Sequence, residues 1–566
     1  MKMKSSKALT MVLTVVFLFA VTASAFAAWP SFQSDLDNNG VLTGTPLTTQ
    51  AGTGVTLTNN TQYLLVTPFN KAGSSFLGTV NNTAVINGGY AYYLYNGGSG
   101  AGSYSGARIA KYDLSTNAEV WNEQASSAVF AQLSTPVLVG DSLYFLSTGA
   151  APVFTNAPAT LNIAKSSSAT VMNEVKLAGT SSARLYVEAA IDAASASTNI
   201  DLSIQVTKPD NAVVDLNMDN DDPTETGAPT TKPLSTTSSS LNKNFSTVFS
   251  TAGDYTIVCK YTNNDLVKDG IVNVSDCQLF ENSFQLKKVN DVTAADPTIS
   301  NVFSAAVSGQ ANTPIEYDGK YLYFGTWTGS GGSYYQVDIS GSSVVTKQYS
   351  PGAGFYWAGA TVVDGKVYFG CDDGNLYWRS VSAFDTTGGV IPASGSAGQI
   401  RSSIMHYDTG TQDVLYFTSR NGYVWRYVID TATLTNQQIT TTSVNSTSTP
   451  VVSDNGVLYV GYYSGFTNGG VRAIAPDLSG SWYDVYTDGP VQCSPIVYSD
   501  VVDYVYFTTN ASAAKGYCYS YVPVSHAATW IWDTPNANYA LGGMSGDGRY
   551  LTFGDNGGSL FVIKKP

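Results

Sequence analysis

The sequence predicts an all-β protein: an eight-bladed β-propeller with a second β-domain inserted into its second blade. Three observations predict this fold: a recurring phrase of two short apolar runs, a nearly constant interval between its copies, and one interval that is far too long. The phrase is a small residue or Pro, two or three apolar residues, an acidic or Gly turn, and an apolar-Tyr-Phe triplet. Such β-branched and aromatic runs around tight turns are typical of antiparallel strands.

Eight copies of the phrase follow one another along the chain. They span residues 84–93, 135–145, 313–324, 361–369, 403–417, 449–460, 494–507 and 542–553. Most neighbouring copies are about 47 residues apart, the length of one four-stranded propeller blade. A single blade cannot bury both of its faces, so the blades are expected to stack side by side around a ring.

One interval between copies, from the second to the third, exceeds a single blade by about 131 residues on this period. The sequence therefore predicts an insertion at 150–281, between propeller segments 28–149 and 282–566. Within the insertion, apolar and polar residues alternate at 183–188, 200–206 and 253–261. Alternation over runs of this length predicts a β-sandwich.

Residues 1–27 have the pattern of an export signal. Lys2, Lys4 and Lys7 precede an apolar run at 8–21, and Ala25-Phe26-Ala27 is a small-x-small cleavage site. A membrane anchor is the less favoured interpretation because the run is short, and no later stretch is apolar enough to span a bilayer. We expect an exported protein that is extracellular, bound to the cell surface or periplasmic.

The charge of the chain excludes one class of partner. Removal of the leader removes three Lys, so the net charge falls from −14 to −17. A strongly acidic protein is a poor ligand for nucleic acid or for anionic membrane surfaces. Only 12% of the residues are charged, so surface recognition is expected to depend on hydroxyl, amide and aromatic groups.

The strand, Asp-Gly turn and strand at 367–377 resemble the PQQ-like repeats of quinoprotein-type and BamB-like β-propellers. Residues 553–561 repeat the pattern, and Trp29-Pro30-Ser31-Phe32 is similar to the lead-in of that family. The resemblance implies that the lead-in, to about residue 60, supplies the outermost strand of the last blade and closes the ring. In the insertion, Gly253-Asp254-Tyr255 with Cys259 is similar to a late strand of immunoglobulin-like and PKD-like domains.

The resemblance also raises an enzymatic alternative, a quinoprotein oxidoreductase that binds pyrroloquinoline quinone and Ca²⁺. Members of that group carry a vicinal Cys-Cys disulfide beside the quinone, and some carry a Cys-x-x-Cys-His haem motif. The sequence has neither motif. Quinone binding is therefore the less favoured prediction, with the repeats acting as a scaffold.

Acidic clusters suggest calcium, because hard cations bind several oxygens at short range. The candidate ligands lie in one loop of the insertion: Asp215, Asp219, Asp221, Asp222 and Glu225. A second candidate, Asp35-Leu36-Asp37-Asn38-Asn39-Gly40, has the first half of an EF-hand loop, but Pro46 stands where the closing acid is needed. Solvated turns are the alternative for both.

The cysteines and histidines give weaker signals. Cys259 and Cys277 are a candidate disulfide within the insertion, Cys493 and Cys518 are a second candidate pair, and Cys371 is left over. His406 and His526 are the only two histidines, and both are expected to be packing or surface residues. A nucleophile-base pair or a zinc site is not supported.

Aromatic residues outside the repeated phrase are the candidate binding surface. They are Trp327, Tyr334, Tyr335, Tyr356, Trp357, Tyr462 and Tyr463. Rigid amphipathic rings suit recognition of glycans or proteins, although core packing is the alternative for each of them. The sequence therefore predicts a non-catalytic binding or scaffold protein for protein or glycan partners, with self-assembly left open. A glycan-active enzyme would require paired carboxylates about 5 to 10 Å apart in one cleft.

Overall fold

The computed structural model describes most of the chain from residue 83 onward and shorter pieces before it. The described residues are 32, 38–42, 46–47, 55–57, 64–68, 83–96, 107–126, 132–155, 158–177, 183–218, 230–237, 239–244, 248–249, 251, 253–305, 311, 313–327, 331–393, 398–555 and 558–564. The predicted export signal at 1–27 lies outside them. No helix in the described ranges is both long and apolar enough to cross a membrane.

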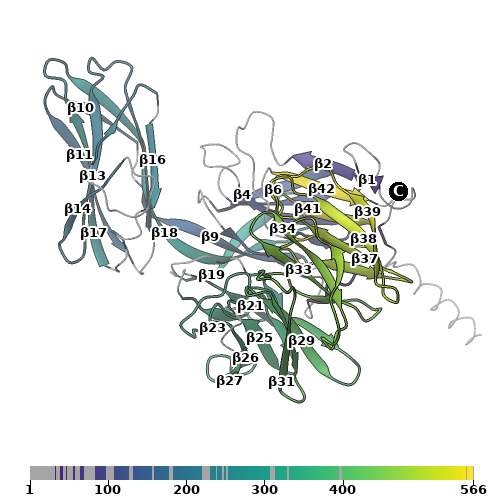
Figure 1. Ribbon diagram of the computed structural model, residues 1–566. Helices are drawn as coiled ribbons and strands as arrows, with labels where there is room; N and C mark the ends of the chain where they lie inside the picture. Colours follow the sequence, from purple (N-terminus) through teal and green to yellow (C-terminus); the bar gives the residue numbers. More distant parts are fainter. Residues whose placement is uncertain are drawn as a thin grey trace, which may run out of the picture.

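The protein is all-β, and its main body is a β-propeller built from four-stranded antiparallel sheets of consecutive strands (Figure 1). Five of these sheets follow the simple order of the sequence, and four of the five lie before residue 440. They are β3 (Val85–Asn87), β4 (Tyr90–Asn96), β5 (Ala107–Asp113) and β6 (Ala118–Ser126); β20 (Glu316–Tyr317), β21 (Tyr321–Gly325), β22 (Tyr334–Asp338) and β23 (Val345–Tyr349); β24 (Thr361–Val363), β25 (Lys366–Gly370), β26 (Asn375–Ser380) and β27 (Gly388–Pro392); and β28 (Met405–Asp408), β29 (Asp413–Ser419), β30 (Tyr423–Val428) and β31 (Thr433–Gln438).

Three further sheets complete the C-terminal part of the propeller. They are β32 (Val451–Val452), β33 (Leu458–Ser464), β34 (Asn468–Ile474) and β35 (Tyr483–Tyr486); β36 (Ile496–Ser499), β37 (Asp503–Thr508), β38 (Gly516–Val522) and β39 (Ala527–Asp533), joined by β1 (Val55–Thr56); and β40 (Ser545–Gly546), β41 (Tyr550–Gly554) and β42 (Ser559–Lys564), joined by β2 (Leu64–Pro68). In each of these propeller sheets the recurring phrase forms the first two strands, as the sequence predicts.

The N-terminal lead-in joins strands from the end of the chain. β1 pairs in parallel with β39, and β2 pairs antiparallel with β42, where Leu64 faces Ile563. The strand that pairs with β42 therefore lies just beyond residue 60, later than the sequence suggested. Closer to the N-terminus, Leu42 donates its backbone N–H to Val497 over 2.7 Å.

Two long strands connect the propeller to a second body. β9 (Ser142–Thr155) and β18 (Gly270–Asn290) pair antiparallel from Leu143 opposite Val289 to Thr155 opposite Gln278. At the propeller end they are flanked by β7 (Gln132–Leu133), β8 (Val137–Val139) and β19 (Thr298–Ala305). The predicted boundaries at residues 149 and 282 fall inside these two strands, so the polypeptide crosses them as continuous β-structure (Figure 1).

The second body, described residues 158–281, is called the two-sheet region here. One sheet contains β10 (Ala159–Ile163), β12 (Ala183–Ile191), β16 (Ser239–Asn244) and the first part of β18. The other contains β11 (Ser168–Leu177), β13 (Ile200–Thr207), β14 (Val213–Asp215), β15 (Lys232–Pro233) and β17 (Gly253–Asn263). Buried side chains from both sheets form a single hydrophobic cluster.

The two bodies bury their strands differently. In β13, buried and partly exposed residues alternate along the whole strand, as expected for a sheet with one face in water. In β25 the four residues from Val367 to Gly370 are all buried. Stacked sheets cover both faces of such a strand, so its aromatic residues form the packing between neighbouring blades.

Candidate binding pocket on the propeller axis

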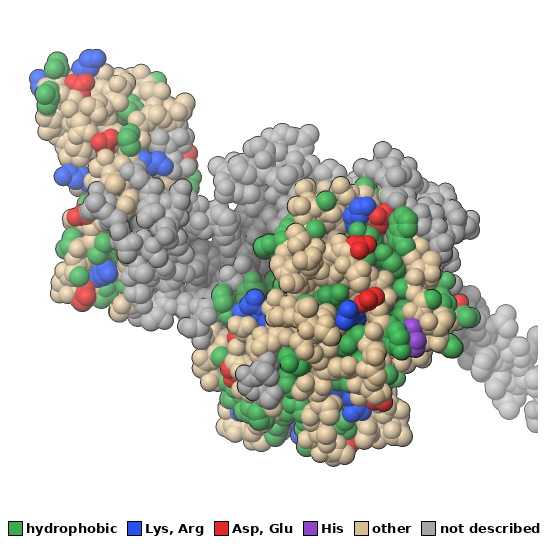
Figure 2. Space-filling view, viewed as in Figure 1, with side chains coloured by type: hydrophobic (Ala, Val, Ile, Leu, Met, Phe, Trp, Pro, Cys, Tyr) green, Lys and Arg blue, Asp and Glu red, His purple; other side chains and the backbone are tan. Residues whose placement is uncertain are grey.

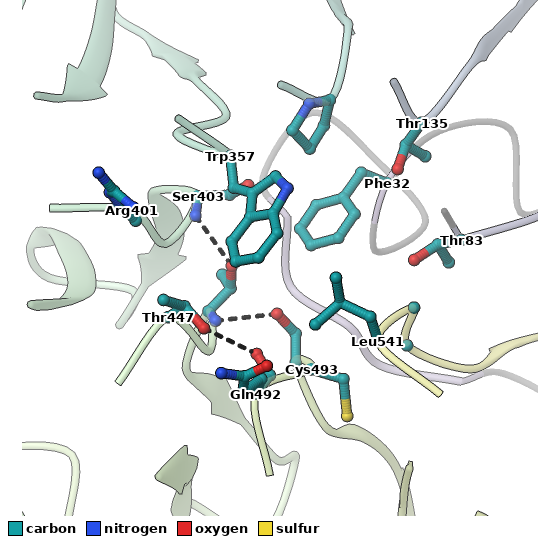
Figure 3. Close-up of a pocket in the computed structure, with 15 residues that line it drawn as sticks. Phe32, Thr83, Thr135, Trp357, Arg401, Ser403, Thr447, Gln492, Cys493 and Leu541 are labelled. Carbon is teal, nitrogen blue, oxygen red and sulfur yellow. Dashed lines mark hydrogen bonds between the residues drawn. The ribbon is translucent and has the colours of Figure 1, made fainter. Parts of the chain in front are cut away.

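An open pocket lies where the first strands of the blades begin, with about 580 Å³ of empty space that includes solvent at its mouth. Its lining residues are Phe32, Thr83, Thr135, Pro314, Trp357, Arg401, Ser403, Thr447, Thr449, Gln492, Cys493, Ser494, Leu541, Gly542 and Gly543 (Figure 3). Most of them directly precede the innermost strand of a sheet, namely β3, β8, β28, β32, β36 or β40. The repeat therefore places equivalent residues from successive blades around one axial cavity.

Hydroxyl groups tie neighbouring blades together around this cavity. Ser403 donates its backbone N–H to Oγ1 of Thr449 over 3.0 Å, and Thr449 donates its own N–H to Oγ of Ser494 over 2.8 Å. The hydroxyl of Thr447 donates to the carbonyl of Gln492 over 3.1 Å. These contacts fix the wall of the pocket. The Oγ atom of Ser403 itself is buried and has no hydrogen-bond partner.

Trp357 supplies an aromatic wall from an unusual backbone conformation. Its φ is 59°, in the left-handed region that a bulky residue rarely adopts and that costs of order 1–3 kcal/mol. The half-buried indole packs on Tyr356 with a ring-centroid distance of 4.6 Å. Figure 3 shows the rings of Trp357 and Phe32 pointing into the same space. Strain of this kind is retained where the orientation of the side chain matters.

A charged cluster borders the pocket beside Trp357. Arg401 donates two hydrogen bonds to the carboxylate of Asp372, from Nε over 2.8 Å and from Nη2 over 2.7 Å. Trp327 donates its indole N–H to the same carboxylate over 2.8 Å. The guanidinium also lies over the ring of Tyr356, 4.6 Å from its centroid. This bidentate geometry holds Arg401 rigidly and neutralises its charge.

The lead-in contributes a buried amide deeper in the propeller. Asn38, with 1% of its surface exposed, donates from Nδ2 to the carbonyl oxygens of Ala360 over 2.6 Å and Ile404 over 2.8 Å. These carbonyls belong to two neighbouring blades, next to β24 and β28. A segment distant in sequence thus connects two blades near the pocket wall.

The pocket is essentially neutral. Arg401 is the only charged residue among the described lining residues, and Asp372 compensates it. Burial raises the pKa of the Cys493 thiol, which keeps it protonated at neutral pH. Hydroxyl, amide, backbone and aromatic groups remain as the contacts available to a ligand. The described lining residues offer no pair of carboxylates of the kind a glycoside hydrolase needs.

The structure brings three of the seven predicted surface aromatics together, namely Trp327, Tyr356 and Trp357. Tyr334 is fully buried and stacks on Phe369 with ring centroids 3.9 Å apart. Tyr335 is also buried, against Phe324.

Tyr462 and Tyr463 are each only 8% exposed. The prediction that these two residues belong to a binding surface is therefore wrong, and the same holds for Tyr334 and Tyr335. The physical reason is that neighbouring sheets cover both faces of a blade strand, so successive residues can both be internal.

The predicted calcium ligands are only partly described. Asp215 lies on β14, where it accepts a hydrogen bond from Gln205 over 2.8 Å. Asp219, Asp221, Asp222 and Glu225 fall outside the described residues, as do Asp35 and Asp37 of the second candidate loop. Within the ranges that the structure describes, no three His, Cys, Asp or Glu side chains form a group that could hold a metal ion.

The cysteines and histidines occupy packing positions. Cys259 and Cys277 face each other across the two-sheet core as free thiols, with their sulfur atoms 3.9 Å apart. Cys493 and Cys518 lie in different hydrophobic clusters, and Cys371 is buried.

The two histidines are more than 100 positions apart in sequence and have separate partners. His406 contacts Asp413 over 2.7 Å through Nε2. His526 stacks on Tyr483 with ring centroids 3.5 Å apart.

Sequence reasoning missed Arg401, Asp372 and the ring of hydroxyl groups. A signal for the ring was present, because Thr135, Ser403, Thr449 and Ser494 are the first residues of their copies of the phrase. A hydroxyl residue recurring at the start of a blade strand indicates a position on the axis. Nothing local in the sequence links Arg401 to Asp372.

No protein-family model and no curated protein sequence matches this chain. Among solved structures, it is similar to BamB from Moraxella catarrhalis, with 13% identity, a TM-score of 0.37, and coverage of 50% of this chain and 78% of that one. It is also similar to Kuenenia stuttgartiensis hydrazine synthase, with 14% identity, a TM-score of 0.35, and coverage of 50% and 89%. A third similar structure is Saccharomyces cerevisiae Sqt1, with 9% identity, a TM-score of 0.36, and coverage of 50% of this chain and 79% of that one.

Proposed function

We propose that this protein is an exported, non-catalytic propeller that binds a neutral glycan in the axial pocket. The observation that carries the proposal is Trp357, whose strained backbone directs an indole ring toward a wall of hydroxyl groups. An aromatic ring stacks on the C–H face of a sugar, while hydroxyl and amide groups exchange hydrogen bonds with its edge.

The electrostatics of the pocket favour a neutral ligand over an anionic one. The guanidinium of Arg401 is already held along one edge by two hydrogen bonds to the Asp372 carboxylate. A carboxylate or sulfate that approached Arg401 would also be repelled by the negative charge of Asp372. A neutral sugar hydroxyl needs no charged partner and can bond to the hydroxyl, amide and backbone groups of the wall.

We further infer that eight blades close into a ring and that the two-sheet region is a sandwich inserted into the second blade. The pairing of β2 with β42 and of β1 with β39 supports closure, since both join the two ends of the chain. The continuous strands β9 and β18 support the insertion site. Closure of the ring would bring the lining residues of all blades to one axis.

Titration calorimetry of the mature protein against a panel of neutral oligosaccharides tests the function. We expect binding that falls at least tenfold in Trp357→Ala, which corresponds to about 1.4 kcal/mol. Trp378→Ala is the matched control, because Trp378 is an aromatic residue outside the pocket lining. Equal loss in both variants, or an absence of glycan binding, would contradict the proposal.

Ser403→Ala is a second control, inside the pocket wall. Because its hydroxyl has no partner in the protein, removal is expected to leave thermal stability unchanged or slightly higher. Because the same atom is buried, affinity for the glycan should also stay unchanged. Stoichiometric binding of pyrroloquinoline quinone, followed by its visible spectrum, would instead favour the oxidoreductase alternative.

A further inference from the structure

We propose that two copies of this chain pair edge to edge through β11, antiparallel, about a twofold axis at Asn173. The proposal concerns the two-sheet region and does not depend on the glycan pocket. Among described strands, β11 pairs only with β17. Within the described part of the chain, its other edge therefore presents a row of backbone N–H and C=O groups to an extended strand that approaches.

The length and composition of β11 make it an effective template for pairing. It has ten residues, contains no Pro and carries only two charges, Glu174 and Lys176. Proteins usually protect a free edge by making it short, charged or bulged. On the opposite edge of the same sheet, β14 has three residues and β15 has two. The long edge is thus the one that lacks this protection.

The burial of the first half of β11 indicates that the edge is open there. Its inward side chains Ala169 and Val171 are only partly buried, whereas Ile257 and Cys259 of neighbouring β17 are fully buried. In the second half of β11, the inward residues Val175 and Leu177 are already buried. On the outer face, Met172 exposes 63% of its surface. A second strand beside β11 would cover both the inward apolar residues and part of Met172.

Asn173 provides an independent indication. It occupies an inward position of β11, and its Nδ2 atom is buried without a hydrogen-bond partner. An unpartnered buried amide is unfavourable. If a second copy of Asn173 faced it across the axis, rotation of each side chain toward the edge would let each amide donate to the carbonyl oxygen of the other.

Complementarity of the strand with itself selects this register. Opposite residues in an antiparallel pair point to the same side, so a twofold axis must pass through a residue. With the axis at Asn173, Val171 faces Val175 and Ala169 faces Leu177 on the inner side. On the outer side Thr170 faces Lys176 and Met172 faces Glu174, so no like charges meet. An axis at Met172 would set Asn173 against Val171.

Cross-linking of the full mature chain tests the register. In Asn173→Cys, the two introduced thiols would face each other, and mild oxidation should give a covalent dimer on a non-reducing gel. In the matched variant Val171→Cys, the equivalent thiols would be separated by about 13 Å along the strands, and no cross-link is expected. The described native cysteines are all buried. Cross-linking of both variants or of neither would overturn the register.

Sedimentation analysis tests the interface itself. The unmodified protein should form a dimer as its concentration rises, and Asn173→Lys should remain monomeric because it places a charge at the axis. Gln205→Lys, at an exposed position of the interior strand β13, should dimerise normally. Far-ultraviolet circular dichroism identifies any variant that fails to fold. The proposal would be overturned if the unmodified protein stayed monomeric at high concentration. It would also be overturned if Asn173→Lys folded and still formed a dimer.

Discussion

The propeller and the two-sheet region use similar strands but protect them in opposite ways. Propeller strands such as β25 are covered on both faces by neighbouring sheets, and the two ends of the chain are joined by β2 and β42. The two-sheet region keeps one face of each sheet in water, and no described strand pairs with the second edge of β11. The comparison teaches that stacking around an axis covers the faces of the sheets and leaves only the edges of the blades, whereas a pair of sheets also leaves one face of each sheet in water.

The largest expected effect tests whether the two bodies unfold separately. Phe561 is 3% exposed and stacks on Phe553 with centroids 4.5 Å apart. Phe561→Ala should destabilise the propeller by about 4 kcal/mol. Calorimetry should show two transitions, and in this variant only the melting temperature of the propeller should fall. Ile257→Ala, in the separate core of the two-sheet region, should lower only the melting temperature of that region. A common shift in both variants would show that the bodies unfold as one unit.

A thiol pair offers a second test, specific to the two-sheet region. The hydrogen bond to Cys277 and burial raise the pKa of the Cys259 thiol, so this thiol reacts slowly as a thiolate in the folded protein. We expect the disulfide to form during folding in an oxidising compartment. Closing this loop should raise stability by about 3 kcal/mol.

Mass spectrometry without reductant should detect the loss of two hydrogens. Cys259→Ala should abolish the stabilisation by oxidant, whereas Cys371→Ala should not. Stability that does not respond to oxidation would contradict the prediction.

Asn38 tests the tie between blades. Asn38→Ala removes two buried hydrogen bonds and leaves the carbonyl groups of Ala360 and Ile404 without these donors. A loss of about 2 kcal/mol is expected from the propeller transition alone. Denaturant unfolding followed by far-ultraviolet circular dichroism measures it in both bodies. Asn264→Ala is the control, because the Asn264 side chain is exposed and bonds to Asp201 at the surface. A comparable loss there would show that burial is not the cause.

The smallest expected effect is on how the stability of the propeller depends on pH. Desolvation raises the pKa of Asp547 in the propeller, so the folded state favours its protonated form. Its charge therefore lowers stability at neutral pH, and the cost disappears as the pH falls through the raised pKa toward the ordinary value. Asp547→Asn should slightly raise the melting temperature at neutral pH and have no such effect in acid.

Asp265 in the two-sheet region should behave in the opposite way. Backbone hydrogen bonds from Val267 and Lys268 lower the pKa of its carboxyl. The stability it contributes is present above the ordinary pKa and is lost as the pH falls through the lowered value. Asp265→Asn should therefore give no gain in melting temperature at neutral pH. A gain equal to that of Asp547→Asn would contradict the assignment of burial as the cause.

The blade strands could be predicted because their pattern is local. The turn at Asp364 and Gly365 follows directly from the sequence, and Val363 pairs with Lys366 across it. The exposure of Tyr334 could not be predicted, because a neighbouring blade covers the second face of its strand.

The pocket was predictable in part. Trp357 was a candidate from its place outside the phrase, but its left-handed backbone depends on the surrounding loops. The Arg401 and Asp372 contact joins residues from two different blades, and no spacing rule relates such residues. Surface composition was easier to foresee: Figure 2 shows scattered charges and no large cluster of one sign on the face in view.

The shared strands β9 and β18 have a mechanical consequence. Tension that draws the two-sheet region away from the propeller acts along both strands at once. Their hydrogen bonds to β8 and β19 run across the strands, so these bonds resist together, in shear, rather than opening one after another. The connection should therefore be mechanically stiff, and a force applied to the two-sheet region should be transmitted directly to one blade of the propeller.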